Sequence, residues 1–298
     1  MIEYVTPYFR PPSEGNSFIL QATIGCSHNE CTYCAMYRQE EQRFRARPME
    51  EIKQIIDEAS ESGQIDDRVF IADGNALVLA QKKLLDIMGY LRGKAPGLER
   101  IRMYANVGDI LRKGVDNLKE LKALGLDMVY IGFESGDDVV LERIKKGANF
   151  AGTVKASRML KEAGVMNSAM VLLGIGGVER SEQHAEATGK LLTACDPEYV
   201  GALSLQLRPG APVYEEWKRG EFELPGKFQM IKELRILVEN TELTGGYFFS
   251  NHISNYLPVK ARFPEDREEV LRSIKAVLES GDESLLRPDY YRDVINQY

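Results

Sequence analysis

The sequence is poor in the residues that hold small secreted or metal-rich domains together: it has four cysteines, three histidines and one tryptophan among 298 residues. Three of the cysteines fall within one short stretch, whereas a disulfide framework spreads its cysteines along the chain. No apolar run is long enough to cross a bilayer, and the opening Met-Ile-Glu-Tyr-Val lacks the basic and apolar parts of a secretory signal. These absences predict a protein of the reducing cytoplasm with no membrane partner.

Positive charge is also in deficit, with 38 Lys and Arg against 45 Asp and Glu and a net charge of −7. Such a chain has no general attraction for nucleic acid, so small molecules are the expected substrates. The length and the 44% hydrophobic content suit one large domain with a small appendage.

The three clustered cysteines, Cys26, Cys31 and Cys34, supply three soft thiolate ligands from one loop. Three thiolates can hold a [4Fe-4S] cubane and leave one iron open for another ligand. A zinc site that adds His28 as the fourth ligand is the alternative, although His28 lies only two residues after Cys26. Cys195 lies beside two leucines and is expected to be a buried small hydrophobe.

This loop resembles the cluster motif of the radical S-adenosylmethionine (radical SAM) superfamily. The usual spacing has three residues between the first two cysteines; here there are four, so residues 27–30 must absorb one more. The second gap of two residues, with Tyr33 before the last cysteine, fits the motif, and we count Tyr33 among the cofactor-binding residues.

The resemblance implies an enzyme with two cofactors, a [4Fe-4S] cluster and S-adenosylmethionine. One electron from the cluster would cleave S-adenosylmethionine to methionine and a 5′-deoxyadenosyl radical, which removes hydrogen from a small molecule. A one-electron donor such as a flavodoxin or ferredoxin is implied as a partner. The non-catalytic alternative is an iron-sulfur or zinc binding module with a sensor or scaffold role.

Apolar runs alternate with amphipathic segments along most of the chain. Strands are expected at residues 17–25, 68–72, 101–105, 128–133, 165–173 and 199–207. Helices are expected at residues 48–62, 80–92, 107–124, 137–146, 153–163, 181–194 and 228–239. Six strand-helix units call for a parallel sheet but are too few for a closed eight-stranded barrel, so the prediction is an α/β fold, a partial (β/α)6 TIM-like barrel.

We expect three regions: an N-terminal arm (1–15), the barrel core (16–225), and a mostly helical C-terminal extension that caps the barrel (226–298), with two amphipathic helices in residues 264–298. The resemblance to radical SAM enzymes covers about the core.

Active sites on parallel sheets lie at the carboxyl ends of the strands, so polar residues there are candidates. Asp73-Gly74-Asn75 corresponds in position to the family motif that holds the methionine amino group, and an ordinary turn is the alternative. Two further candidates are Asn106 after the third strand and Ser168 in the fifth.

Glu134 ends the fourth strand, where the resemblance implies contact with the ribose or methionine; the alternative is a helix-capping region. Lys146 stands where similar enzymes of the coproporphyrinogen-dehydrogenase type have an arginine for the methionine carboxylate. A cation that simply stabilises a helix end is the alternative for Lys146.

Four residues are candidates for substrate contact. Arg208 follows the sixth strand, and a surface ion pair is its alternative. Asn251, His252 and Tyr256 lie in a segment, residues 247–258, that mixes aromatic groups with amides and hydroxyls, as pockets for functionalised small molecules do. A packed segment around a core histidine is the alternative.

Overall fold

The computed structural model describes residues 4–289. Within this range the chain forms two compact units, which are described separately. The first unit comprises residues 4–29, 36–131 and 158–167, and the second comprises residues 30–35, 132–157 and 168–289.

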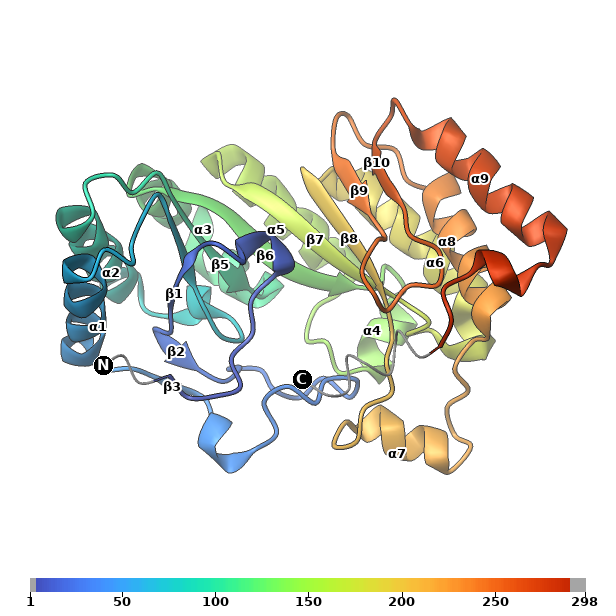
Figure 1. Ribbon diagram of the computed structural model, residues 1–298, viewed down its shortest axis with the longest axis horizontal. Helices are drawn as coiled ribbons and strands as arrows, with labels where there is room; N and C mark the ends of the chain where they lie inside the picture. Colours follow the sequence, from blue (N-terminus) through green and yellow to red (C-terminus); the bar gives the residue numbers. More distant parts are fainter. Residues whose placement is uncertain (1–3, 290–298) are drawn as a thin grey trace. The chain divides into compact units, whose positions relative to one another are not determined.

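The first unit contains four parallel strands in the order β1, β4, β5, β6, and a helix follows each of β4 and β5. The strands are β1 (Phe18–Leu20), β4 (Arg68–Ile71), β5 (Arg100–Ala105) and β6 (Leu126–Glu134), of which β6 continues into the second unit. The helices are α1 (Met49–Glu61), α2 (Gln81–Lys94) and α3 (Val107–Ala123); α1 packs beside α2 and α2 beside α3 (Figure 1).

Hydrophobic spacing explains these elements. In α1 the buried residues are Ile52, Ile55, Ile56 and Ala59, which is the one-faced pattern of an amphipathic helix. On the sheet, the aromatic rings of Phe70, Tyr104 and Tyr130 pack edge to face.

The first predicted strand, residues 17–25, is in fact two short strands. β1 pairs with β4, whereas β2 (Thr23–Ile24) turns away and pairs antiparallel with β3 (Arg45–Ala46). The break falls at Gln21, whose buried side chain bonds to the backbone of Val5 and to Asp73 instead of following a strand. In the sequence, β2 precedes the cysteine loop and β3 follows it.

The second unit contains strands in the order β7, β8, β9, β10. β7 (Met166–Leu173), β8 (Tyr199–Ser204) and β9 (Tyr247–Phe249) are parallel, and β10 (Lys260–Arg262) is antiparallel to β9. Its helices are α4 (Asp138–Arg143), α6 (Gly177–Cys195), α7 (Pro212–Lys218), α8 (Lys227–Glu239) and α9 (Arg267–Ser280), and α8 packs between α6 and α9 (Figure 1).

Helix α5 (Phe150–Ala163) connects β6 to β7 and has residues in both units. The remaining elements are single 3₁₀ turns: η1 (Pro12–Glu14), η2 (Glu40–Gln42), η3 (Ala76–Val78) and η4 (Glu283–Leu285). None of the helices within residues 4–289 is long and apolar enough to span a membrane.

Six parallel strands, β1, β4, β5, β6, β7 and β8, therefore alternate with helices, as the predicted α/β fold requires. The C-terminal extension also contributes β9, which pairs with the edge of β8, so it is not purely helical. Of the two helices expected in residues 264–298, α9 is present; η4 is a single 3₁₀ turn, and residues 290–298 lie outside the described part.

Two boundaries differ in ways that affect the site. Helix α4 ends at Arg143, not at Lys146, because Lys145 takes a left-handed conformation with φ of 52° and Gly147 follows with φ of 70°. Strand β8 ends at Ser204, three residues before the predicted end.

Candidate functional site

The cysteine loop begins in the first unit at Gly25 and Cys26, where two glycines permit close backbone contact. A Cβ at Gly25 would lie 2.0 Å from the Gln42 carbonyl oxygen, and one at Gly74 would lie 2.4 Å from the Cys26 Cα. Gly74, predicted to bind cofactor, therefore lies directly against the first cluster cysteine, and a larger residue cannot fit there without moving the loop.

Asn75 holds the next residue of the loop. Its Oδ1 accepts from the Ser27 backbone N–H at 3.0 Å, and its Nδ2 donates to Ser27 Oγ at 2.8 Å and to Asp109 Oδ2 at 2.7 Å. Asn75 is fully buried, and both of its N–H groups are used within the protein. Asn75 therefore clamps the cysteine loop at Ser27, and its contact with the cofactor stays a prediction.

Asn106 reaches the same network through Asp109. It caps α3, with its side chain bound to the backbone three residues on, while Asp109 accepts from the Asn106 N–H at 3.2 Å. Asp109 is buried and forms an ion pair with Arg112. The sequence analysis missed Asp109, although a carboxylate three residues after an N-cap asparagine is a capping-box pattern.

Asp73 is a buried carboxylate in a left-handed conformation, with φ of 70°. Gln21 Nε2 donates to its Oδ2 at 2.7 Å, and the Tyr37 hydroxyl lies 3.5 Å from its Oδ1. Burial raises the pKa of Asp73 to about 6, against 3.8 for an ordinary aspartate. A cationic ligand group would favour its ionised form.

Asn29, in the longer first gap of the cysteine motif, is left-handed with φ of 43°. Its Nδ2 donates to the Tyr37 carbonyl at 2.7 Å, and its own carbonyl accepts from Arg38 at 2.9 Å. Asparagine tolerates this conformation better than most residues.

The second unit holds Cys31 and Cys34 at a tight turn, where the Cys34 N–H donates to the Cys31 carbonyl at 3.2 Å. Thr32 fixes this turn to the rest of the unit. Its N–H donates to the Ile144 carbonyl at 3.0 Å, and its carbonyl accepts from the Val213 N–H at 2.9 Å.

Tyr33, Glu134 and Lys146, which are far apart in the sequence, meet in the second unit. The Tyr33 hydroxyl donates to Glu134 Oε1 at 2.7 Å, and Lys146 Nζ lies 2.9 Å from the same oxygen. Burial and the charge of Glu134 raise the pKa of Tyr33 well above its usual value, so Tyr33 remains a hydrogen-bond donor. Within residues 4–289, Glu134 Oε2 takes part in no hydrogen bond, so it can accept one from a ligand.

The local backbone explains this meeting. Glu134 has φ of 61°, and the Ser135 N–H donates to the Phe133 carbonyl at 2.7 Å, so the strand ends in a γ-turn that is strained for a residue with a side chain. Lys146 follows the left-handed Lys145, and its N–H closes the helix end on the Leu141 carbonyl at 3.0 Å.

A buried polar network lies behind this turn. Ser135 Oγ lies 2.7 Å from His184 Nδ1, and His184 Nε2 lies 3.2 Å from Glu233 Oε1, without the angle of a hydrogen bond. Glu233 also accepts from the Gly174 N–H at 2.6 Å and from Ser181 Oγ at 2.8 Å. Helix α8 thus contributes a carboxylate that orders the ends of β6 and β7, a role the sequence did not indicate.

Ser168 is buried in the first half of β7, opposite Tyr199, the first residue of β8. The carboxyl end of β7 is at Leu173, so Ser168 is not among the strand-end residues.

The predicted substrate residues differ in their surroundings. Arg208 is half-buried and donates to Gln206 Oε1 at 3.2 Å. His252 is half-buried beside Ser254, whereas Asn251 is exposed and offers its carbonyl to Arg287. Tyr256 is buried and its hydroxyl donates to Asp289 at 3.0 Å, which is the contact of a packed side chain.

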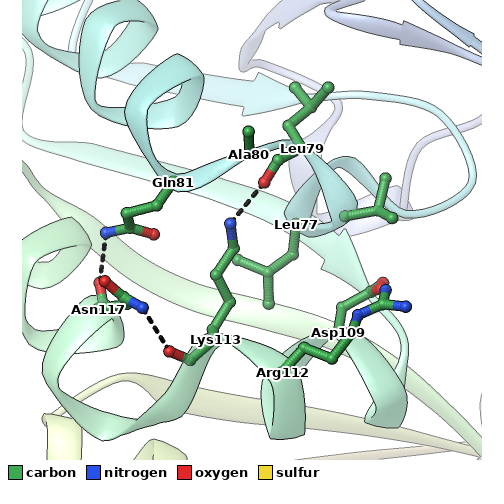
Figure 2. Close-up of a pocket in the computed structure, with 9 residues that line it drawn as sticks. Leu77, Leu79, Ala80, Gln81, Asp109, Arg112, Lys113 and Asn117 are labelled. Atoms are coloured by element: carbon green, nitrogen blue, oxygen red, sulfur yellow. Dashed lines mark hydrogen bonds and ion pairs between the residues drawn. The ribbon is translucent and has the colours of Figure 1, made fainter.

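A cavity of about 210 Å³ lies in the first unit between η3, α2 and α3 (Figure 2). Its polar residues largely bind one another: Lys113 donates to the Leu79 carbonyl, and Gln81 donates to the Asn117 carbonyl at 2.9 Å. The cavity is below the roughly 300–1,000 Å³ of typical ligand pockets, so we do not assign the cofactor to it.

The three loop cysteines fit the cluster by their chemistry. Each is a half-buried thiol that forms no disulfide, whereas Cys195 is buried in α6. Within residues 4–289, no three His, Cys, Asp or Glu side chains gather as ligands of one metal ion, so the cluster is assigned from the donor chemistry and the family.

Comparison with known proteins identifies the family. The sequence model of the Radical SAM superfamily matches residues 20–191, more than half of the chain. The heme chaperone HemW of Bacillus subtilis (strain 168) is 24% identical over 241 residues, which cover 78% of this chain and 61% of HemW. The chain thus spans less than two thirds of this relative.

Solved structures show the same fold. Methylornithine synthase (PylB) aligns with a TM-score of 0.52 and 18% identity over 77% of this chain and 65% of PylB. Coproporphyrinogen III oxidase (HemN) from Escherichia coli aligns with a TM-score of 0.54 and 14% identity over 75% of this chain and 51% of HemN. The chain therefore belongs to the radical SAM superfamily, the enzymes that pair a [4Fe-4S] cluster with S-adenosylmethionine, as the cysteine motif predicted.

Proposed function

We propose that this enzyme cleaves S-adenosylmethionine reductively and uses the product to remove a hydrogen atom from a small molecule. When bound, the cluster and S-adenosylmethionine supply one electron and a 5′-deoxyadenosyl radical, with methionine as the second product. The electron comes from a donor of the flavodoxin or ferredoxin class, and the reducing cytoplasm would keep the cluster intact.

Cys26, Cys31 and Cys34 would hold three irons of the cluster. The observation that carries the proposal is the open oxygen of Glu134 at a strand end, because its partner Tyr33 stands between Cys31 and Cys34 in the cysteine loop. This geometry puts an acceptor for ligand hydroxyl or ammonium groups beside two cluster ligands. Lys146 would balance the charge of Glu134 and face an anionic group of the ligand.

The first unit would contribute Asp73 for a cationic group, with Gly74 and Asn75 holding the loop at Cys26 and Ser27. In this proposal the protein binds and orients the cofactors, and the cofactors carry the difficult chemistry.

The test is anaerobic. The reconstituted protein, S-adenosylmethionine and dithionite should give 5′-deoxyadenosine by mass spectrometry. Cys31→Ala should abolish it, and Glu134→Gln should raise the KM for S-adenosylmethionine about tenfold, the effect of one charge-assisted hydrogen bond. Glu142→Gln, on the exposed side of α4, is the matched control. A loaded, reduced cluster that gives no product with any of a broad metabolite panel would contradict the proposal.

A second candidate, haem handling, follows only from the match to HemW. His184 is fully buried, so His28 and His252 are the histidines within reach of a haem iron. Titration with hemin decides: a shifted Soret band that His28→Ala or His252→Ala removes would support haem binding, and an unshifted band would exclude it.

A further inference from the structure

The direction of the Glu134 carboxylate depends on two backbone features of β6. Gly132 leaves the space that the carboxylate occupies, because a Cβ there would overlap Glu134 Oε1 and lie 2.8 Å from Lys146 Nζ. Glu134 itself has φ of 61°, a conformation that persists in a residue with a side chain only where the surrounding structure holds it. The residues that hold this turn therefore decide where the open oxygen Oε2 points.

Helix α6 holds the three residues that follow Glu134 through side chains spaced four residues apart, which lie on one face of a helix. The contacts join Ser135 Oγ to His184 Nδ1 (2.7 Å), the Gly136 N–H to Thr188 Oγ1 (2.9 Å), and Arg180 Nε to Asp137 Oδ2 (2.8 Å). Each residue of the turn is thus tied to α6 by a different side chain.

The backbone of the turn also lies directly against α6. A Cβ at Gly136 would overlap the Ala187 carbonyl and lie 2.7 Å from the Thr188 nitrogen. No larger residue fits there unless the helix or the turn moves. The turn after Glu134 is therefore placed by the helix behind it.

The proton positions follow from the contacts of Ser135. The Asp137 N–H donates to Ser135 Oγ at 3.0 Å, so the hydroxyl proton needs another acceptor. Among the described residues that acceptor is His184 Nδ1, because the other hydroxyl near the ring, Thr188, donates to the His184 carbonyl at 2.6 Å. A ring nitrogen that accepts carries no proton, so neutral His184 has its proton on Nε2, which faces Glu233 Oε1 at 3.2 Å.

Ser135, His184 and Glu233 have the order of a serine-histidine-acid triad, but none of them is accessible. Ser135 and His184 are fully buried, and Glu233 is 1% exposed. A nucleophile must reach its substrate, and a fully buried hydroxyl does not. The hydrogen bonds of Ser135 instead connect the backbone of the turn to α6 and, through His184, to α8.

From these contacts we infer that His184 is a positioning residue for the binding of S-adenosylmethionine: through Ser135 it holds the turn that directs the open oxygen of Glu134. His184 does not touch the ligand in this arrangement, and Glu233 fixes its ring from the other side. Without His184 the strained backbone of Glu134 relaxes, and the carboxylate leaves its place beside Tyr33. The inference rests on the proposed function, because it deepens the part that Glu134 plays there.

Calorimetry with S-adenosylmethionine on the anaerobic, cluster-loaded protein tests the inference without reductant, so it does not depend on cleavage. Ser135→Ala and His184→Leu should weaken the affinity for S-adenosylmethionine about tenfold, the loss expected when one charge-assisted hydrogen bond is misplaced. His184→Asn should bind more tightly than His184→Leu, because the asparagine Oδ1 can accept the Ser135 proton in place of Nδ1.

A second substitution separates positioning from a general loss of stability. In Glu134→Gln, the further change Ser135→Ala should cost no additional affinity, because the charged acceptor that the turn directs is already gone. Thr193→Val is the matched control. It removes another α6 hydroxyl, which donates to the Asn240 carbonyl at 2.9 Å, and it should bind S-adenosylmethionine as the parent does.

Hydrogen exchange at residues 132–137, measured without S-adenosylmethionine, reports the turn itself. We expect faster exchange in Ser135→Ala and His184→Leu and the parent's rate in Thr193→Val. Iron and sulfide content and circular dichroism check each variant, and Ser135→Ala decides alone if His184→Leu does not fold.

Three results would overturn the inference. Exchange at the parent's rate in Ser135→Ala does so in every case. Where Glu134→Gln weakens binding, the parent's affinity in Ser135→Ala does so as well, and so does a loss from Ser135→Ala that is as large in Glu134→Gln as in the parent. Unaltered affinity in Glu134→Gln would instead count against the proposed role of Glu134, and the exchange would then decide whether His184 holds the turn.

Discussion

At the scale of single residues, three candidate cofactor-binding side chains come together in the second unit. Tyr33, Glu134 and Lys146 were selected separately, and they meet at one carboxylate oxygen. Their meeting depends on φ of 61° at Glu134 and on the left-handed Lys145, and neither has a signature in the residue types. A glycine in the sequence would indicate a possible left-handed conformation, whereas glutamate and lysine do not.

Other residues were missed because their role depends on a partner far along the chain. Gln21 stands within a run that predicts a strand, yet its side chain donates to Asp73. His184 and Glu233 lie in ordinary amphipathic helices and are completely buried, and nothing in the helical pattern identifies them as partners.

Gly74→Ala should disturb the cluster loop. The new Cβ would lie 2.4 Å from Cys26 Cα and 2.7 Å from the Gly25 carbonyl oxygen, so backbone must move, at a cost of about 1–3 kcal/mol. We expect less than about half of the parent's iron and sulfide after reconstitution, in keeping with that strain. Gly89→Ala in α2, where a Cβ meets no other atom within 4 Å, is the control. Full cluster content in Gly74→Ala would show that the loop adapts.

Asp73 predicts a pH dependence of stability. Its pKa is about 6 in the fold against 3.8 when unfolded, so the folded state binds the proton more tightly. Stability is therefore lost as pH rises from about 4 to 6, by about 3 kcal/mol at about 1.4 kcal/mol per unit. Asp73→Asn should raise the free energy of unfolding of the cluster-free protein at pH 7, and this gain should shrink as the pH is lowered toward 4.

Urea unfolding at several pH values between 4.5 and 7.5 measures this effect. Asp86→Asn, at an exposed ion pair in α2, provides the control. A gain for Asp73→Asn that is the same at every pH would mean that ionisation of Asp73 is not its origin.

At the scale of elements, alternation of apolar and amphipathic segments predicted the parallel strands β1, β4, β5, β6, β7 and β8, because buried parallel strands and their covering helices differ in period and length. The errors lie at strand and helix ends. Residues 17–25 read as one β-branched run, but β2 turns away to pair with β3, and only pairing with Arg45 and Ala46 reveals it.

The strands β9 and β10 were not predicted as strands. Each has three residues, too few for an alternation pattern, and each exists because a partner is present: β8 for β9, and β9 for β10. β10 is the short strand at the edge of the sheet, and strands as short as β9 and β10 are specified by packing more than by propensity.

Helix α8 should act on the site through Glu233. In Glu233→Ala the Gly174 N–H and Ser181 Oγ lose their buried acceptor, which costs about 1–3 kcal/mol for each group left without one. We expect a lower free energy of unfolding and faster hydrogen exchange at residues 174–181. Lys232→Ala, also in α8, removes an exposed ion pair with Glu182 of α6. This control should leave both the free energy of unfolding and the exchange at residues 174–181 unchanged. Unaltered exchange in Glu233→Ala would exclude the role we assign to α8.

At the scale of the whole molecule, the charge balance argues against nucleic acid as a partner. A net charge of −7 offers no field that would hold a polyanion. We expect no shift of bulk tRNA in a native gel at 50 mM or 150 mM salt with micromolar protein, and a salt-sensitive shift would contradict this expectation.

The left-handed Asn29 lies between the first two cysteines of the motif, in the gap that is one residue longer than usual. It forms a self-contained bulge, tied to Tyr37 and Arg38 and separate from the hydrogen bond that closes Cys31 on Cys34. The hydrogen bonds of Asn29 therefore end on Tyr37 and Arg38, whereas the Cys31–Cys34 turn is closed by its own hydrogen bond. Motif searches that insist on a fixed number of residues between the first two cysteines would pass over every relative built in this way.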